Sequence, residues 1–348
     1  MKFDFAALKG FDMRVSKNLG IDLGTSNTLI YEAGRGIVVQ QPTVAAVNSR
    51  SLETMEVGDA ANLMLGKTSG EVRAFHPIRD GVIAEIDVAE EMLSRLMKKV
   101  SKVSFIYRPR VAVAVPHGIT GVDRRSFEDV AVNAGARGVT LIPKPLADAL
   151  GLGLKISAPS GNLIINIGGG MTEIATVSLG GIVTAATIRT GGTHMDDAIA
   201  VYIRRRYSVT VSQKTAEQLK MRIGSAHPSA DGGTLEVRGK RIETGLPVML
   251  KINAAEIREA IGEQLSQIVD SLRKVLEKTP PEICSDIYDH GIYLTGGCAS
   301  LPGMGALMTQ VTGIRTIVCE KPMQSCVLGL GKYIEHPERY PFLSQKRM

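Results

Sequence analysis

Two segments of the chain share one hydrophobic pattern: an apolar run ends in a glycine-rich turn, and two further apolar runs follow around a second glycine turn. The first segment is residues 18–39 and the second is residues 162–183. Asp22 and Asn166 hold matching places near the end of the first apolar run in each. Short apolar runs bounded by glycine turns are typical of buried strands. We therefore expect two related halves that each open with a three-stranded meander.

Between and after the repeats, strand and helix patterns alternate. Apolar residues recur at helical spacing over residues 88–100, and the run at 111–115 is typical of a buried strand that Pro116 ends. We expect further helices over residues 198–207, 215–223 and 256–276, and a strand over residues 292–295 that leads into Gly296 and Gly297. This alternation predicts an α/β fold.

The composition excludes a disordered chain and a membrane-spanning one. Of 348 residues, 44% are hydrophobic and 22% are charged, which is enough apolar material for about two compact domains. No run approaches the ~18 consecutive apolar residues of a membrane helix, and the first residues lack a signal-peptide pattern, so we expect a cytoplasmic protein. The four cysteines form no C-x-x-C pair and predict reduced thiols rather than disulfides or a zinc site.

The charge balance favours an anionic partner but not nucleic acid. The net charge of +6 suits phosphate or a lipid surface. The chain has 7 Phe, 8 Tyr and no Trp, and residues 204–206 are its one dense basic run. Single-strand binders need aromatic stacking platforms, for which this chain has little material.

The matched glycine turns at residues 24–27 and 168–170 carry the main chemical signal. Glycine lets several backbone N–H groups converge on one point, which makes an anion site, and two facing turns would grip a polyphosphate. Each turn by itself is equally consistent with an ordinary tight turn. The P-loop and Rossmann motifs are absent from the sequence, so phosphates would lie between strand turns rather than at a helix N-terminus.

At this point the sequence resembles the MreB-type bacterial actins of the actin superfamily. The resemblance covers nearly the whole chain and is most specific at residues 20–28, 79–84, 108–111, 215–220, 244–247 and 294–297. It implies an actin-like fold, in which two RNase H-like halves enclose a nucleotide cleft. The first half would be residues 1–158 with an insertion at 46–78, the second residues 159–335 with an insertion at 195–258, and residues 336–348 a tail.

The resemblance also implies the nucleotide site for ATP or ADP. It places the nucleotide against Asp22, Gly24, Thr25, Ser26, Asn27, Gly168, Gly169, Gly170, Met171, Gly192, Glu217, Gln218, Leu219, Lys220, Gly296, Gly297, Cys298 and Ala299. Asp22 would also face a metal ion through water. Glu217 and Lys220 lie one helical turn apart, so they can face the ribose and base together. Without the surrounding motif, they would be read as a solvated charge pair.

Three positions depart from the family pattern, and all three are chemically active in the family. Lys144 stands where the family has a Glu that orients the attacking water, Asn166 replaces an Asp that holds hydrated Mg²⁺, and Met171 replaces a Thr that assists the water. A protonated lysine accepts no proton and methionine offers no hydroxyl. Positioned acid-base groups are worth ~10²–10⁴-fold each, so we expect weak or absent hydrolysis.

The same changes shift the charge of the phosphate site. Asn166 removes a negative charge and Lys144 adds a positive one, which favours ATP binding with less dependence on Mg²⁺. The alternatives are drift of an unselected site, or Lys144 pairing with Asp148 one turn on. A working ATPase in which Glu173 or Asp22 activates the water is the competing enzymatic hypothesis.

Two segments are candidates for membrane contact. The first is the N-terminal extension, where apolar residues that include Phe3, Leu8 and Phe11 would lie on one side of a helix. The second is the triplet Phe105, Ile106 and Tyr107, which is flanked by basic residues. Apolar tips beside basic residues suit an anionic bilayer. A frayed or packed arm, and burial of Phe105 in the core, are the alternatives.

The function that the resemblance implies is a filament-forming scaffold for cell shape. Its expected partners are further copies of the chain, paralogous MreB-like proteins, an anionic membrane surface and cell-elongation membrane proteins, and nucleic acid is not expected. Its expected place is the inner face of the cell membrane. A chaperone would need a peptide-binding domain after the nucleotide fold, and a sugar kinase larger insertions, so neither is favoured.

Overall fold

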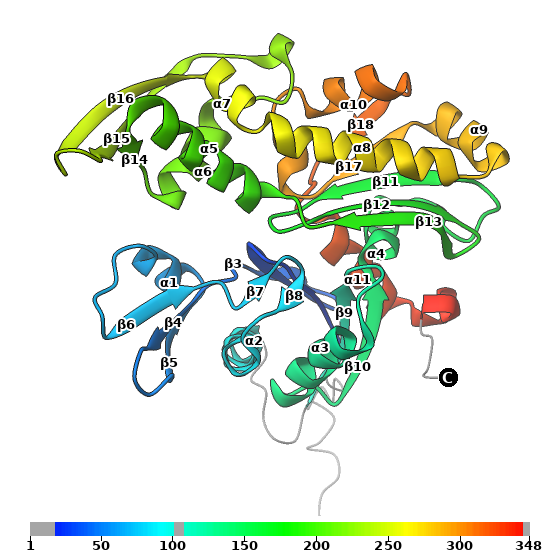
Figure 1. Cartoon of the computed structure of the whole chain (residues 1–348). Coiled ribbons are helices and arrows are strands. Elements are labelled where there is room, and N and C mark those ends of the chain that lie inside the picture. Colours follow the sequence, from blue (N-terminus) through cyan, green and yellow to red (C-terminus); the bar gives the residue numbers. More distant parts are fainter. Residues whose placement is uncertain (1–17, 101–107, 344–348) are drawn as a thin grey trace, which may run out of the picture.

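The computed structural model describes residues 18–100 and 108–343. Its framework is two five-stranded sheets with the same topology (Figure 1). In spatial order the first sheet is β10 (Gly138–Pro143), β9 (Arg110–Val115), β1 (Leu19–Leu23), β2 (Asn27–Glu32) and β3 (Gly36–Pro42). The second is β18 (Thr316–Val318), β17 (Ile292–Thr295), β11 (Asn162–Ile167), β12 (Thr172–Ser178) and β13 (Gly181–Ile188).

Each sheet begins with the meander that the repeated pattern predicts. The pairs β1–β2 and β2–β3 are antiparallel, as are β11–β12 and β12–β13, whereas β1 pairs in parallel with β9 and β11 with β17. Every residue of the central strands β1 and β11 is buried, which explains their continuous apolar runs. Asp22 and Asn166 therefore sit at equivalent places near the carboxyl ends of the two central strands.

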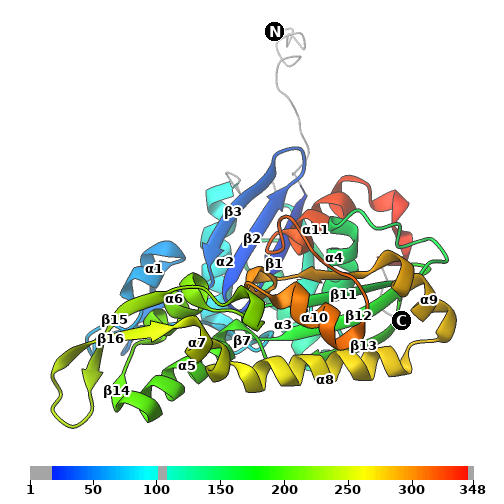
Figure 2. The ribbon, with the colours of Figure 1, turned by 90° about the horizontal axis from the view of Figure 1, so that it is seen from above.

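Helices cover the outer faces of the sheets. In the first half α2 (Ile86–Val100) and α3 (Gly121–Asn133) pack against each other and contribute to the core beneath the first sheet. In the second half α8 (Gly262–Lys278) packs on β12 and β13 and runs along them (Figure 2). The other helices there are α9 (Pro281–His290) and α10 (Met304–Thr312). No helix within the described residues is long and apolar enough to span a bilayer.

The two halves meet through α4 (Lys144–Gly151) and α11 (Ser325–Glu335), which cross between the sheets. The crossing is very close, because a Cβ added at Gly151 would lie 1.8 Å from the Ser325 carbonyl oxygen. One added at Gly329 would lie 1.8 Å from the carbonyl oxygen of Ala147. Glycine at both positions is therefore what allows the contact. The shared apolar core around this crossing takes side chains from both sheets.

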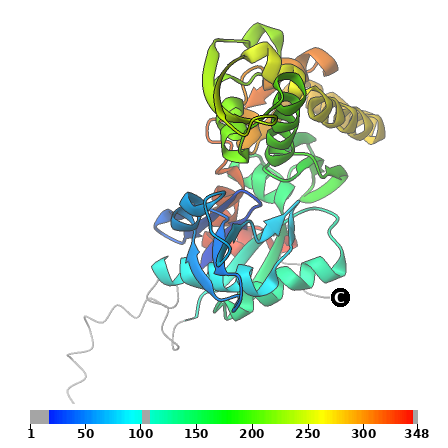
Figure 3. The same cartoon turned by 60° about the vertical axis from the view of Figure 1, so that its left-hand side comes forward.

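A small sheet extends from each half, and the two extensions lie on the same side of the molecule (Figure 3). The first contains β4 (Ala45–Asn48), β5 (Thr54–Val57), β6 (Val72–Phe75) and α1 (Asp59–Met64). The second contains β14 (Val209–Thr210), β15 (Thr234–Arg241) and β16 (Pro247–Asn253), beside α5 (Gly192–Tyr207), α6 (Gln213–Ile223) and α7 (Ala254–Ala260). The hairpin β7 (Ile78–Arg79) and β8 (Val82–Ile83) leads back from the first.

The single helix expected over residues 256–276 is wrong, because the chain forms α7 and α8 with a break between them. Asn253 caps α7 in a reciprocal capping box with Glu256. Ile261 then leaves the helical region at φ −94° and ψ 4°, directly before Gly262. Glycine loses more backbone entropy in a helix than other residues do, so it favours the break. The other expected helices and strands are present, with ends shifted by up to six residues.

Candidate functional site

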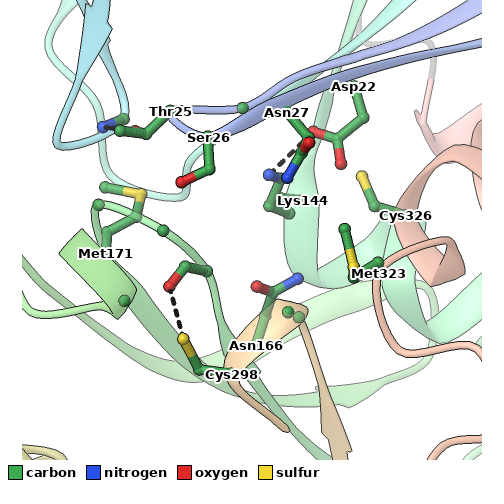
Figure 4. Close-up of a pocket in the computed structure, with 18 of the residues that line it drawn as sticks. Asp22, Thr25, Ser26, Asn27, Lys144, Asn166, Met171, Cys298, Met323 and Cys326 are labelled. Carbon is green, nitrogen blue, oxygen red and sulfur yellow. Dashed lines mark hydrogen bonds and ion pairs between the residues drawn. The ribbon is translucent and has the colours of Figure 1, made fainter. Parts of the chain in front are cut away.

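A cavity of about 230 Å³ lies where the two halves face each other (Figure 4). Its walls come from the β1–β2 turn, the β11–β12 turn, α6 and the loop after β17. In Figure 4, Thr25 and Ser26 lie on one side, and Asn166 and Met171 lie opposite. The carboxyl ends of the two central strands open into this cavity, the usual place for a ligand in sheets of this kind.

Most of the residues predicted to bind nucleotide are brought together here. The lining includes Asp22, Gly24, Thr25, Ser26, Asn27, Gly168, Gly169, Gly170, Met171, Gly192, Glu217, Lys220, Gly296, Gly297 and Cys298. Gln218, Leu219 and Ala299 are not among the lining residues. Leu219 and Ala299 are buried in the core of the second half, and Gln218 points to solvent from α6. Consecutive residues of a helix point in different directions, so the side chains of residues 217–220 do not all face the cavity. Their contact with nucleotide remains a prediction.

The two glycine turns have the same internal geometry and touch each other. Gly24 N donates to Asn27 O at 3.1 Å, and Gly168 N donates to Met171 O at 2.9 Å. An added Cβ would lie 2.0 Å from Ser26 Oγ at Gly169 and 2.6 Å from Thr25 Oγ1 at Gly170. Only residues without a side chain permit this approach. The turns thus form one cradle of backbone amides, with the character of an anion site.

Lys144 reaches across this cradle to Asp22. It begins α4 directly after β10, and its Nζ lies 2.9 Å from Asp22 Oδ1 (Figure 4). Both side chains are largely buried, with 17% and 10% exposure. Burial by itself would lower the pKa of Lys144, but the charges of Asp22 and Glu173 and the hydrogen bond to Asp22 outweigh it and raise that pKa above its usual range. Lys144 is therefore a permanent cation.

Asp148 is not the partner of Lys144, so that alternative is wrong. Its two oxygens accept hydrogen bonds from other groups, from Asn166 Nδ2 to Oδ2 and from Ser325 Oγ to Oδ1, each at 2.6 Å. The side chain is fully buried, and burial raises the pKa of Asp148 to about 6 against these two hydrogen bonds and the charge of Lys144. The network fixes the Asn166 amide, so a neutral group stands where the second central strand meets the cavity.

Glu173 is a further acid of the cavity wall. Its Oε1 accepts the backbone N–H of His117 at 2.8 Å, which links the two halves. Its Oε2 has no hydrogen-bond partner among the described residues. Burial raises the pKa of Glu173 to about 7, although the charge of Lys144 and the His117 N–H oppose the shift. This carboxyl is thus poised to change its protonation state near neutral pH.

Met171 closes the cavity on the side of the β7–β8 turn. An added Cβ at Gly81 would lie 2.4 Å from Met171 Cε and 3.2 Å from Pro116 Cγ, so the thioether packs directly over that turn. The same turn approaches the second half through Asp80 Oδ1, which lies 3.5 Å from His194 Nε2. Met171 therefore makes an apolar contact between the halves and brings no hydroxyl to the cavity.

On the α6 side, Lys220 is held by a buried partner that sequence reasoning missed. Its Nζ lies 2.7 Å from Asp196 Oδ1 and donates to Gly192 O at 2.8 Å. Lys220 is 8% exposed, so the alternative of a solvated charge pair on the helix is wrong for it. Glu217 remains exposed at the cavity. Asp196 lies on α5, and a contact between two helices cannot be predicted from a local sequence pattern, which is why this partner was missed.

Sequence reasoning also missed several lining residues, most of which lie outside the motifs. They are Leu23, Leu29, Gly81, Ala114, Pro116, Glu173, Asp196, Met221, Pro322, Met323, Ser325 and Cys326, although Glu173 was considered as an alternative base. Met221 follows Glu217 by four residues on α6, and that helical spacing is the one local signal available. The predicted membrane residues Phe3, Leu8, Phe11, Phe105, Ile106 and Tyr107 lie outside the described residues.

The donors at the phosphate end do not fit a directly ligated Mg²⁺ ion. Magnesium prefers carboxylate and phosphate oxygens in a strict octahedral arrangement. The Asp22 carboxylate is paired with Lys144, Asn166 is neutral, and both oxygens of Asp148 are already hydrogen-bonded. Across residues 18–100 and 108–343, no group of three or more His, Cys, Asp or Glu side chains is placed to hold a metal.

Comparison with known proteins agrees with this architecture. The chain is 43% identical over 333 residues to the cell shape-determining protein MreB of Escherichia coli K12, covering 94% of this chain and 96% of that protein. It is 36% identical to the cell shape-determining protein Mbl of Bacillus subtilis over 326 residues, 94% of this chain and 98% of that protein.

Solved structures show the same fold. MreB5 of Spiroplasma citri bound to AMPPNP superposes with a TM-score of 0.89 at 33% identity, covering 94% of this chain and 98% of that one. The MamK double helical filament has a TM-score of 0.79 at 19% identity over 92% and 98% of the two chains, which supports the actin-like fold alone. The MreB/Mbl protein family model matches residues 16–341. The chain therefore belongs to the MreB/Mbl family and has its actin-like fold.

Proposed function

We propose that this chain is a nucleotide-binding, filament-forming scaffold for cell shape at the inner face of the membrane, and that it hydrolyses ATP weakly or not at all. The observation that carries the second part is the Lys144–Asp22 ion pair, because it places a fixed cation where the family has its water-orienting carboxylate. A protonated lysine cannot accept a proton from attacking water.

Nucleotide binding is supported by the cavity and by the similar structures. The cradle of glycine amides suits phosphates, and MreB5 of Spiroplasma citri has been solved with ADP and with AMPPNP. Glu217 and Lys220 stand on α6, at the side of the cavity where the nucleoside is expected. ATP or ADP is therefore the proposed ligand.

Loss of hydrolysis is supported by all three departures together. Lys144 is a cation paired with Asp22, the Asn166 amide is fixed by Asp148, and Met171 packs over Gly81. None of these groups can activate or orient a water as a base would. Since positioned acid-base groups are worth ~10²–10⁴-fold each, their combined loss leaves turnover near background.

Assembly and location are proposed from the relatives. The similar MreB and Mbl proteins are named for determining cell shape. On this basis the chain would polymerise with itself or with a paralogous MreB-like protein on an anionic membrane, and would act with cell-elongation membrane proteins. Disassembly would then depend on a partner rather than on hydrolysis by this chain.

A working ATPase is the second candidate, and Glu173 is the observation that favours it. Its pKa of about 7, and an oxygen that has no hydrogen-bond partner in the described part of the chain, suit a general base. In that reaction water would attack the γ-phosphorus, Glu173 would take its proton, and the bond to the β-phosphate oxygen would break to release ADP. Asp22 is a weaker base candidate because Lys144 pairs with it.

The test follows phosphate release and assembly in the same samples. Purified chain is given ATP with and without Mg²⁺ and anionic liposomes, and is examined by single-turnover phosphate release, sedimentation and electron microscopy. Filaments without phosphate release support the proposal. Brisk release that Glu173→Gln or Asp22→Ala abolishes would establish the ATPase instead, and the absence of filaments under every condition would remove the scaffold function.

A further inference from the structure

We propose that the Lys144 ammonium serves as the resident counter-cation of the phosphate cradle, so that this chain binds metal-free nucleoside triphosphate at least as tightly as the Mg²⁺ complex. The inference rests on the proposed nucleotide binding and names the form of nucleotide that the site selects. Its starting point is the mismatch between the donor set and a magnesium ion.

Few charged side chains line the described cavity wall near the two glycine turns. Asp22 pairs with Lys144 at 2.9 Å, Glu173 is a second acid of the cavity wall, and Asn166 is a neutral amide that donates to Asp148. The second lysine of the described cavity wall, Lys220, is committed to Asp196 and to the Gly192 carbonyl on the α6 side. Of these two lysines, Lys144 is therefore the one that lies at the cradle and can contact phosphate there.

Lys144 has donors to spare. An ammonium group carries three N–H donors, and Asp22 occupies one of them. The side chain is 17% exposed and lines the cavity, so the remaining donors have access to a ligand in the cradle. The buried setting strengthens an ammonium–phosphate contact compared with one in bulk water.

The same arrangement disfavours a divalent cation. A Mg²⁺ ion beside Asp22 would have to displace or approach the Lys144 ammonium, with which it shares a sign of charge. It would also find an amide instead of a carboxylate at Asn166. Magnesium that arrives on ATP neutralises phosphate charge that Lys144 would otherwise bind, so metal and lysine compete for one role.

The deciding experiment is calorimetric titration, since the chain has no Trp to report binding. Full-length protein is titrated with ATP in excess Mg²⁺ and again in EDTA. We expect affinity in EDTA to equal or exceed affinity in Mg²⁺. The variant Lys144→Gln should lose about tenfold in EDTA, about 1.4 kcal/mol, and less in Mg²⁺. Lys155→Gln, which removes an exposed lysine outside the cavity wall, is the matched control and should change neither.

Each outcome has one meaning. Binding that requires Mg²⁺ overturns the inference while leaving nucleotide binding intact. Absence of binding in both buffers overturns the proposed function and the inference with it. The comparison within the wild type needs no variant, and the pair Asp22→Asn with Lys144→Gln provides a neutral site if Lys144→Gln alone unfolds. Unchanged affinity in EDTA for a folded variant that lacks the ammonium also refutes the role of Lys144.

Discussion

Removing one partner of the Lys144–Asp22 pair should destabilise the protein far more than removing both. In Lys144→Met, the Asp22 carboxylate stays in a largely buried place without its cation. At the observed 2.9 Å separation, the Coulomb attraction is about 6 kcal/mol for an effective dielectric constant of about 20. Desolvation of the two ions offsets much of this, and breaking a buried pair costs about 3–5 kcal/mol. Because both side chains keep some exposure to solvent, we expect the free energy of unfolding to fall by about 3 kcal/mol, the lower end of this range.

The double variant Asp22→Asn with Lys144→Met supplies the comparison. With both charges removed, we expect stability within about 1 kcal/mol of the wild type, because no unpaired charge is left buried and burying a neutral amide costs far less than burying a carboxylate. Urea unfolding without nucleotide, followed by circular dichroism for both single variants and the double variant, gives the coupling energy directly. If Lys144→Met lowers the free energy of unfolding by less than about 0.5 kcal/mol, the pair contributes no more than a solvent-exposed salt bridge does, and the reasoning is refuted.

Three further outcomes are expected. The pKa of Glu173 is raised to about 7 from its ordinary 4.5, so the folded state holds this proton more tightly than the unfolded state; the resulting stabilisation is complete below pH 4.5 and is lost as the pH rises to 7. Glu173→Gln should flatten the urea midpoint over that pH range, and an unchanged slope would contradict this reasoning. Gly329→Ala places a methyl group 1.8 Å from a carbonyl oxygen in the helix crossing and should cost several kcal/mol, about 3 or more, seen as a large fall in melting temperature. The triple variant Lys144→Glu, Asn166→Asp and Met171→Thr should raise single-turnover phosphate release by ~10²-fold or more, and no gain would mean that other groups limit hydrolysis.

The framework could be predicted from local patterns because burial leaves its mark on consecutive residues. The two meanders show as apolar runs with glycine turns, since a central strand buried on both faces needs an apolar residue at nearly every position. Matching places for Asp22 and Asn166 follow from the repeat. The glycine turns could be identified as a shared cradle because glycine marks backbone close approach. The domain limits at residues 158 and 335 remain predictions.

Contacts between distant segments could not be predicted in the same way. The charge of Lys144 is evident from the sequence. That Lys144 pairs with Asp22 and not with Asp148 depends on how β10 and α4 lie relative to β1. Asp196 meets Lys220 because α5 packs against α6. The break between α7 and α8 has a local signal, Gly262, but the amphipathic pattern continues across the break and so predicts a single helix.

By itself, the sequence determined the repeated halves, the glycine cradle, the family resemblance and the replacement of three active positions, because each is written in residue identity and local spacing. Only the tertiary structure decided which groups these three side chains contact. It pairs Lys144 with Asp22, fixes Asn166 through Asp148 and Ser325, and lays Met171 over Gly81. The reason is physical: hydrophobic periodicity reports the burial of each residue, whereas the partner of a buried charge is set by which segments of the chain the fold brings within a few ångströms.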